Sequence, residues 1–513
     1  MTTALLGRWL SRAADPRAIA RELPGGAEVA GHAGPLRETS WRDAVAAADR
    51  VASALLEGRR SLEGERVALL VAPGVDFLAC LFGVWRAGGC AVVLSPVHPA
   101  PETRYFCDDA KVRTVVASPV LAGRVAFLAS GEPPRRVVLT SDLVAGAGAP
   151  SIAAESGESD PALQLYTSGT TGKPKGAVIT HANLARQQEL LAEAWSWSAG
   201  DVLLHVLPLH HLHGLGIALL TAMGAGAAAH FLPFDARATW EAMPRATVFM
   251  GVPTIHTKLL AALDEADAPT RDRWIAGARG LRLVTSGSAA LPVRVGERWR
   301  AITGAYPLER FGMTEIGVGA SNLLDPAARR PGSVGLPLRT VGTRIVGDDG
   351  QEAESGELWI AGPCVFTGYS ERPEATRAAF VEHAGERWFK TGDTVARAPD
   401  GYLKILGRTS VDILKSGGYK LSALEIEEVL REHVAVGEVA VVGVADELWG
   451  ERVVACVVPR AGQESACSED ALRSFAKERL APYKVPKEVR LMKDLPRNPI
   501  GKVLKPALVK LIS

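Results

Sequence analysis

The first feature of the sequence is an alternation of short apolar runs with helical patterns, which begins near Glu65. The apolar runs are residues 67–71, 90–94 and 112–117, and the helical segments between them are residues 77–84 and 101–109. Buried strands that alternate with helices are typical of βαβ units on a parallel sheet. The pattern therefore predicts an α/β fold for the larger, N-terminal part of the chain.

A change of pattern near residues 408–410 marks a domain boundary. It is followed by a glycine loop, an amphipathic segment at 424–430, two β-rich runs and a final helix before Lys502. The β-rich runs are residues 439–444 and 453–458. This order suits a small α+β domain. We expect a large domain at residues 1–408 and a small domain at residues 409–513.

Composition and charge limit the class of partner. The 513 residues contain 58 basic and 57 acidic side chains, which leaves a net charge of +1. Such a balance favours neither nucleic-acid binding nor an electrostatically held membrane patch, so we expect small-molecule substrates and no stable membrane association. The longest uncharged stretch, residues 214–229, is broken by glycine and short for a bilayer span, which favours a buried helix.

The cysteines and the N-terminus bear on location. Six dispersed cysteines form no CxxC pair and show no metal spacing, as suits a reducing compartment, and we expect a cytoplasmic protein. Residues 1–21 carry arginines and no acid before Asp15, a weak likeness to a transit peptide. Their hydrophobic positions also fit an ordinary first helix, which we favour.

The run 166–176, Tyr-Thr-Ser-Gly-Thr-Thr-Gly-Lys-Pro-Lys-Gly, carries the clearest chemistry. Its glycines, hydroxyl groups and lysines can converge on phosphate oxygens. The spacing differs from the Walker loop, and a flexible linker would seldom contain Lys-Pro-Lys between two apolar runs. The predicted ATP-binding residues here are Thr167, Ser168, Gly169, Thr170, Thr171, Gly172 and Lys173. This run resembles the signature loop of the adenylate-forming superfamily of acyl-CoA synthetases, adenylation domains and luciferases.

The resemblance assigns nucleotide roles to four further segments. In 311–315 an aromatic residue would lie against adenine, Thr314 would contact phosphate, and Glu315 would help to hold Mg²⁺. Asp393 and Arg408 would bind the ribose. The remaining residues expected at the nucleotide are Gly287, Ser288, Phe311, Gly312 and Met313. Phenylalanine replaces the usual tyrosine at the aromatic position, which keeps the stacking face and loses a hydroxyl group.

The resemblance also implies a mobile C-terminal domain with the catalytic lysine. Lys502, after Pro-x-x-x-x-Gly, would act with Thr167 and Glu315 in catalysis by bridging the attacking carboxylate and the α-phosphate. A solvated surface lysine is the alternative. The loop of Ser416, Gly417 and Gly418 would approach coenzyme A, and the hinge would lie near Ser410.

The acyl pocket has fewer sequence signals. The run 207–214 contains three histidines without the carboxylate or cysteine spacing of a metal site, and the resemblance places it, with His213, beside the acyl group. Ser286 is expected there as well. Arg282 would supply a fork for a second carboxylate, although a surface arginine on an edge strand is the alternative.

The combined segments are most similar to malonyl-CoA synthetases. The segments are 207–214, 251–254, 281–290, 308–315 and 412–419. The expected activity is acid–thiol ligation with ATP, Mg²⁺ and coenzyme A, and malonate is the expected acid. A ligase for a short or medium monocarboxylate is the nearest alternative. A luciferase-like oxygenase and an inactive nucleotide-binding regulator are more distant ones.

Overall fold

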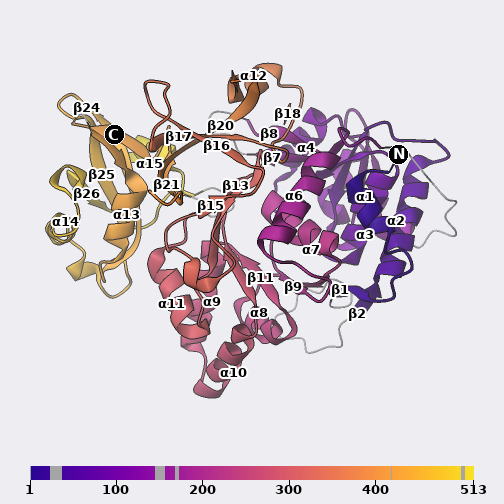
Figure 1. Cartoon of the computed structure of the whole chain (residues 1–513), viewed down its shortest axis with the longest axis horizontal. Helices are drawn as coiled ribbons and strands as arrows, with labels where there is room; N and C mark the ends of the chain where they lie inside the picture. Colours follow the sequence, from indigo (N-terminus) through magenta and orange to yellow (C-terminus); the bar gives the residue numbers. More distant parts are fainter. Residues whose placement is uncertain are drawn as a thin grey trace. The chain divides into compact units, whose positions relative to one another are not determined.

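The computed structural model describes residues 2–22, 37–144, 156–167, 173–417, 419–497 and 503–512. Its backbone contacts divide the chain into two compact units (Figure 1). The first unit contains residues 1–342 and 360–389, and the second contains residues 343–359 and 390–513. The expected domain boundary between residues 408 and 409 remains a prediction.

A seven-stranded sheet in the first unit contains the predicted βαβ units. Its order is β18-β8-β7-β4-β3-β5-β6, with β3, β4, β5 and β6 parallel. The strands are β3 (Arg66–Leu70), β4 (Cys90–Val93), β5 (Thr114–Ala117), β6 (Arg136–Leu139), β7 (Pro161–Thr167), β8 (Lys175–Thr180) and β18 (Gly368–Tyr369). All four residues of β4 are buried, because a central parallel strand is covered on both faces.

Three of the helices in this region begin at polar side-chain caps. Ser40 caps α2 by accepting a hydrogen bond from the Asp43 backbone N–H, and Thr180 and Asn183 form a capping box at α6. The helices are α1 (Ala4–Leu10), α2 (Trp41–Leu56), α3 (Val75–Arg86), α4 (Ala100–Asp109), α5 (Thr140–Val144) and α6 (His181–Ala194). The predicted first helix and the two helical segments are confirmed as α1, α3 and α4.

A nine-stranded sheet in the same unit has the order β15-β14-β13-β12-β11-β9-β10-β1-β2. Its strands are β1 (Ala18–Glu22), β2 (Arg37–Ser40), β9 (Val202–His205), β10 (Ala228–Phe231), β11 (Val248–Gly251), β12 (Leu283–Ser286), β13 (Leu308–Met313), β14 (Gly317–Ser321) and β15 (Leu336–Pro337). The five strands from β9 to β13 are parallel. Their carboxyl ends therefore meet at one edge of the sheet.

The helices that accompany this sheet follow its strands in the chain. They are α7 (Leu220–Ala225), α8 (Ala236–Ala242), α9 (Pro253–Glu265), α10 (Ala268–Arg279) and α11 (Val293–Thr303). The last four pack on one another (Figure 1). The uncharged stretch expected to form one buried helix forms a buried π-helix, His213–Leu219, then α7, and ends in β10. No helix in the described ranges is long and apolar enough to cross a bilayer.

The first unit ends with α12 (Pro373–Ala379), β19 (Phe380–His383) and the beginning of β20 (Glu386–Arg397), which pairs with β19. In the second unit, β16 (Gly342–Val346), β17 (Ser355–Ala361) and β20 are neighbours in that order, and β21 (Leu403–Arg408) pairs with β20.

The second unit also contains an α+β region with its own hydrophobic core. Its strands are β22 (Ile413–Ser416), β23 (Tyr419–Ser422), β24 (Val436–Asp446), β25 (Gly450–Pro459) and β26 (Glu488–Leu491). Its helices are α13 (Ala423–Arg431), α14 (Glu469–Lys477) and α15 (Lys505–Ile512). The two β-rich runs and the amphipathic segment are thus confirmed as β24, β25 and α13.

Candidate active site

The carboxyl ends of the parallel strands in the nine-stranded sheet bring several polar side chains together. His205, Gly251 and Ser286 are the last residues of β9, β11 and β12. The strand register places Ser286 opposite Gly251 on one side and Glu309 on the other, so Arg310 comes one residue later on β13. Ligand sites of open α/β sheets form at such carboxyl ends.

Arg310 is a buried cation at this edge. Its residue is 4% exposed, and its Nε and Nη2 atoms have no hydrogen-bond partner within the described part of the chain. Burial lowers the pKa of the guanidinium to about 9, so the group still carries its charge at neutral pH. A buried charge without a partner is costly, which indicates that an anion completes the site when substrate is bound.

A glycine makes room for this guanidinium. A Cβ atom on Gly287 would lie 2.5 Å from Cζ of Arg310, far inside contact distance. Gly287 belongs to the turn after β12, in which Ser288 has a positive φ of 69°. The turn therefore brings backbone and hydroxyl groups against Arg310 where a larger residue would displace it.

His213, the first residue of the π-helix, lies beside Ser288 and Arg310. Its Nδ1 atom lies 3.1 Å from Oγ of Ser288, while Nε2 is buried with no partner among the described residues. Burial, and next the charge of Arg310, hold the pKa of His213 well below its ordinary value. The imidazole is therefore neutral and can exchange hydrogen bonds without adding charge. The buried Oγ of Ser286 likewise has no partner in the described ranges.

Arg282, expected to bind a second carboxylate, is placed elsewhere by the structure. It precedes the first residue of β12, at the end of the strand opposite Ser286, and its guanidinium donates to both carboxylate oxygens of Asp201 at 2.6 and 2.7 Å. A third donor bonds the Trp195 carbonyl at 2.9 Å. Burial raises the pKa of Asp201, but the bonds from Arg282 and Thr247 outweigh it and hold that pKa below its ordinary value. The paired N–H donors of the Arg282 guanidinium are thus already bonded to Asp201 of the protein.

Glu315 follows the end of β13 and is 5% exposed. The hydroxyl of Tyr369 donates a hydrogen bond of 2.9 Å to Oε1 of Glu315, and the backbone N–H of Phe366 donates to its carbonyl at 2.8 Å. Before it, Gly312 faces the Gly317 carbonyl, where a Cβ would lie at 2.2 Å. Phe311, Met313 and Thr314 in the same segment are half-buried.

The fit of Mg²⁺ can be judged from this donor set. Mg²⁺ usually takes one or two protein carboxylates and completes its shell with water and phosphate oxygens. Glu315 is one such carboxylate, oriented by Tyr369. The described residues contain no cluster of three or more His, Cys, Asp or Glu side chains arranged for a metal. A single oriented carboxylate fits an ion whose other ligands are phosphate oxygens and water.

Both ends of the run that is predicted to bind phosphate are anchored in the seven-stranded sheet. Thr167 ends β7 and pairs with Lys175 on β8, while Ser168, Gly169, Thr170, Thr171 and Gly172 lie outside the described residues. The Lys173 ammonium lies 5.4 Å from the ring centre of Tyr105, whose hydroxyl donates to the Pro174 carbonyl at 2.8 Å. The Lys175 ammonium lies 5.1 Å from the ring centre of Tyr369.

In the second unit, Asp393 and Arg408 are partners across β20 and β21. Arg408 Nε lies 3.1 Å from Oδ1 of Asp393, which is 5% exposed, and Arg408 Nη1 donates to the Thr391 carbonyl at 2.7 Å. The two residues assigned to the ribose are therefore held together. Their contact with a nucleotide remains a prediction.

The glycine loop that is expected to approach coenzyme A is described only in part. Ser416 is buried and pairs with Tyr419 across β23. Gly417 has a positive φ of 58°, and its N–H donates to the Trp449 carbonyl at 2.8 Å. Gly418 and Lys502 lie outside the described residues, so their roles stay predictions.

Sequence reasoning missed two residues that the structure brings to the site. Arg310 is adjacent to the 311–315 motif, but only the burial of its side chain shows that it lacks a partner. Tyr369 is 54 residues from Glu315, and its contact depends on the pairing of β18 with β8. No local pattern in the sequence marks this contact.

An α/β scaffold with polar residues at its strand ends, together with an α+β region, is compatible with a nucleotide-binding enzyme. The chain belongs to the AMP-binding enzyme family: the family's main domain matches residues 17–370, and the AMP-binding enzyme C-terminal domain matches residues 425–502.

Three similar proteins indicate which members of the family this chain resembles. The mitochondrial malonate–CoA ligase of Bos taurus is 41% identical over 500 residues, covering 88% of this chain and 82% of that protein. The oxalate–CoA ligase of Arabidopsis thaliana is 34% identical, covering 89% of this chain and 90% of that protein. The crystal structure of ATP-bound MatB from Rhodopseudomonas palustris superposes with a TM-score of 0.87 at 33% identity, covering 100% of this chain and 99% of that one.

Proposed function

We propose that the protein is an ATP-dependent, AMP-forming acid–thiol ligase that converts malonate and coenzyme A to malonyl-CoA. Family membership supports adenylate chemistry, and the relative from Bos taurus carries malonate in its name. The observation that carries the choice of acid is Arg310, a buried guanidinium with unpaired donors at the strand edge. A monocarboxylate would leave that charge unpaired, whereas the second carboxylate of malonate would pair with it.

The first half-reaction joins the acid to the nucleotide. One carboxylate oxygen of malonate attacks the α-phosphorus of ATP, a P–O bond forms, and the bond to the β-phosphate breaks to release pyrophosphate. Arg310 holds the distal carboxylate, and the neutral His213 and the hydroxyls of Ser286 and Ser288 supply hydrogen bonds beside it. Holding the acid in one orientation converts the encounter into an intramolecular step.

The phosphate-binding run and Glu315 act on the nucleotide. The run from Thr167 to Lys173 would bind the β- and γ-phosphates, with Asp393 and Arg408 on the ribose and Phe311 beside adenine. Glu315, oriented by Tyr369, is the carboxylate that would hold Mg²⁺ with the phosphates. The ion supplies charge neutralisation for the displacement at phosphorus. Lys502 would stabilise the charge that develops on the α-phosphate.

The second half-reaction transfers the acyl group. The sulfur of coenzyme A attacks the acyl carbon, a C–S bond forms, the C–O bond to AMP breaks, and the thiol proton is released. Ser416, Gly417 and Gly418 would border the path of the thiol, because a glycine loop allows close approach.

Cytoplasmic location is likewise a proposal, and the relative from Bos taurus is mitochondrial by its name.

The deciding experiment measures pyrophosphate release with ATP, Mg²⁺ and coenzyme A across oxalate, malonate, succinate, acetate and butyrate. We expect malonate to give the highest kcat/KM and malonyl-CoA as product. A higher kcat/KM for butyrate would replace the proposal with a monocarboxylate ligase. Oxygen consumption in place of thioester formation would favour the luciferase-like alternative.

A further inference from the structure

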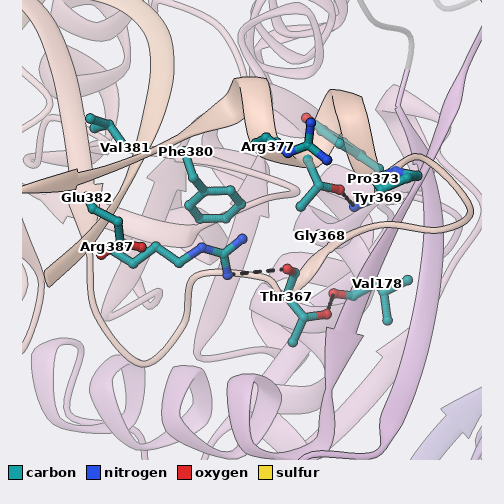
Figure 2. A pocket seen from close by; sticks show the side chains of 11 residues that line it. Val178, Thr367, Gly368, Tyr369, Pro373, Arg377, Phe380, Val381, Glu382 and Arg387 are labelled. Atoms are coloured by element: carbon teal, nitrogen blue, oxygen red, sulfur yellow. Dashed lines mark hydrogen bonds between the residues drawn. The ribbon is translucent and has the colours of Figure 1, made fainter.

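A surface pocket of about 630 Å³ lies in the first unit, between β8, β18, α12, β19 and β20. Figure 2 shows Arg377 and Arg387 extending into it from α12 and β20, with Phe380 between them. The lining residues are Val178, Thr367, Gly368, Tyr369, Pro373, Thr376, Arg377, Phe380, Val381, Glu382 and Arg387. None of the residues assigned above to the acid, ATP or coenzyme A belongs to this lining.

Arg387 is held in the pocket by an aromatic ring. It is the cross-strand partner of Glu382, and opposite charges at such positions commonly pair. Its guanidinium instead lies 3.5 Å from the ring centre of Phe380 and reaches the Thr367 carbonyl at 3.5 Å (Figure 2). Phe380 itself packs on Phe366 with ring centres 5.6 Å apart. The other donors of this pre-oriented guanidinium remain available to a ligand.

Arg377 is the second cation and has no ion pair among the described residues. The acids Asp109 and Glu371 are paired with Arg372 and Lys111, and Glu374 lies one turn before Arg377 on α12. The segment that carries Arg377 is anchored, because Thr376 Oγ1 accepts a 2.9 Å hydrogen bond from the Tyr369 N–H. Two arginines and one glutamate give the described lining a net charge of +1.

The pocket also shares a wall with the nucleotide site. Tyr369 lines the pocket, and its hydroxyl donates to Glu315, the carboxylate proposed to face the metal and phosphates. Phe366, which supports Phe380, donates its N–H to the Glu315 carbonyl. An occupant that shifts Gly368 or Tyr369 would therefore act on Glu315 through one side chain.

We propose that this pocket is a second anion site, which binds a small molecule bearing a pyrophosphate group through Arg377 and Arg387. Two planar forks suit adjacent phosphates, because each can bind oxygens through two parallel N–H donors. The volume falls in the range of small-molecule sites and exceeds what one carboxylate would fill. Free pyrophosphate and a nucleoside diphosphate offer the same chemistry. The site does not depend on the identity of the acid that the enzyme activates.

The test is arginine labelling by phenylglyoxal on the full chain, read by peptide mass spectrometry. Inorganic pyrophosphate at ten times its dissociation constant should slow labelling of Arg377 and Arg387 about tenfold by occupancy. Arg124 is the matched control. It is an exposed arginine in the 3₁₀ segment after β5, a strand near the edge of the sheet that is opposite to β18. Labelling of Arg124 should be unchanged.

Parallel arms with ADP and citrate define the ligand. Protection by ADP as well as pyrophosphate would assign a nucleotide as an occupant, and protection by pyrophosphate alone would assign the free anion. Equal protection by citrate, or protection of neither Arg377 nor Arg387, would overturn the proposal. Calorimetry should also detect one pyrophosphate site fewer in the Arg377→Gln/Arg387→Gln variant than in wild type, and an unchanged stoichiometry would contradict the assignment.

Discussion

Arg310 places a positive charge in the interior of the first unit, beside neutral groups. His213 has a depressed pKa, and Ser286 and Ser288 contribute hydroxyls, so the guanidinium sets the sign of the site. The side chain is fixed against Gly287, where even one methyl group would collide with it. Under the proposed function, selection of a dianion over a monoanion would rest on this one side chain, and a substitution tests it directly.

Substitution of Arg310 should separate the two classes of acid. In Arg310→Met the distal carboxylate of malonate loses its partner, which costs about 2–5 kcal/mol for a buried charge pair. The kcat/KM for malonate should fall roughly 30-fold or more. Butyrate makes no such pair and should be affected little or favoured. Arg310→Lys should restore malonate activity poorly, because a point charge lacks the bidentate fork.

Arg282→Met is the control for this experiment. Arg282 also bonds a carboxylate, but that carboxylate is Asp201 of the protein. Its loss should lower the free energy of unfolding and reduce activity on the two acids in proportion. A selective loss of malonate activity in Arg282→Met, with Arg310→Met unselective, would return the substrate role to Arg282.

The hydroxyl of Tyr369 can be removed without its ring. Tyr369→Phe keeps the ring that faces Lys175 and deletes the hydrogen bond to Glu315. A hydrogen bond to a charged group contributes about 1.5–3 kcal/mol, so the Mg²⁺ concentration for half-maximal pyrophosphate release should rise roughly tenfold. The thermal midpoint should change little. An unchanged Mg²⁺ dependence would show that Tyr369 does not orient the carboxylate.

Among the elements, α15 is attached to the second unit by a buried ionic cluster. The Lys505 ammonium lies 2.5 Å from Asp412 and 2.6 Å from Glu427, with side-chain exposures of 11%, 13% and 5%. Burial alone would lower the pKa of Lys505, but Glu427 and Asp412 outweigh it and hold the pKa above its ordinary value. The cluster joins α15 to the segment after Arg408 and to α13.

Lys505→Met should destabilise this region. Removal of the ammonium leaves the buried carboxylate of Asp412 without its ion-pair partner, at a cost of about 3–5 kcal/mol, while Glu427 keeps its ion pair with Arg431. Because the folded pKa is raised, the contribution of the lysine is fully present below its unfolded pKa of about 10.4 and is lost as pH rises through the folded pKa. Urea unfolding at pH 7 and pH 9 should show the same deficit. Lys510→Met, an exposed lysine of α15, is the control and should unfold like wild type.

The elements differ in how far sequence predicts them. Strands such as β3, β4 and β5 appear as continuous apolar runs because both faces are covered. The pairing of β18 with β8 joins residues about 190 apart and leaves no local pattern, so Tyr369 could not be assigned to Glu315.

The prediction that Arg282 binds a second carboxylate has a similar origin. Arg282 and Ser286 are four residues apart, but a strand rises about 3.3 Å per residue, which separates them by about 13 Å along the sheet. They therefore lie at opposite edges. The ligand contacts of the motifs at the strand ends stay predictions, and the choice between Arg282 and Arg310 required knowledge of which guanidinium already has a partner.

For the whole molecule, a large α/β part and a smaller α+β region agree with the two matches to AMP-binding enzymes. The assignment of two half-reactions to two conformations rests on the family pattern. Lys502→Ala should abolish pyrophosphate release with malonate yet leave thioester formation from supplied malonyl-AMP largely intact, since one lysine would serve only adenylation. Single-turnover assays measure both. Equal loss of the two steps would contradict the division.

Arg310 is buried and the pocket arginines are exposed, so anion binding at the two places should depend differently on salt concentration. Arg310 is 4% exposed, so mobile ions cannot enter between it and a bound carboxylate, whereas Arg377 and Arg387 are exposed. The Debye length falls from about 30 Å at 0.01 M salt to about 8 Å at 0.15 M. The KM for malonate should therefore change little with added potassium chloride, while pyrophosphate protection of Arg377 should weaken steadily. In one protein, the depth of each guanidinium would determine which anion is retained as the salt concentration rises.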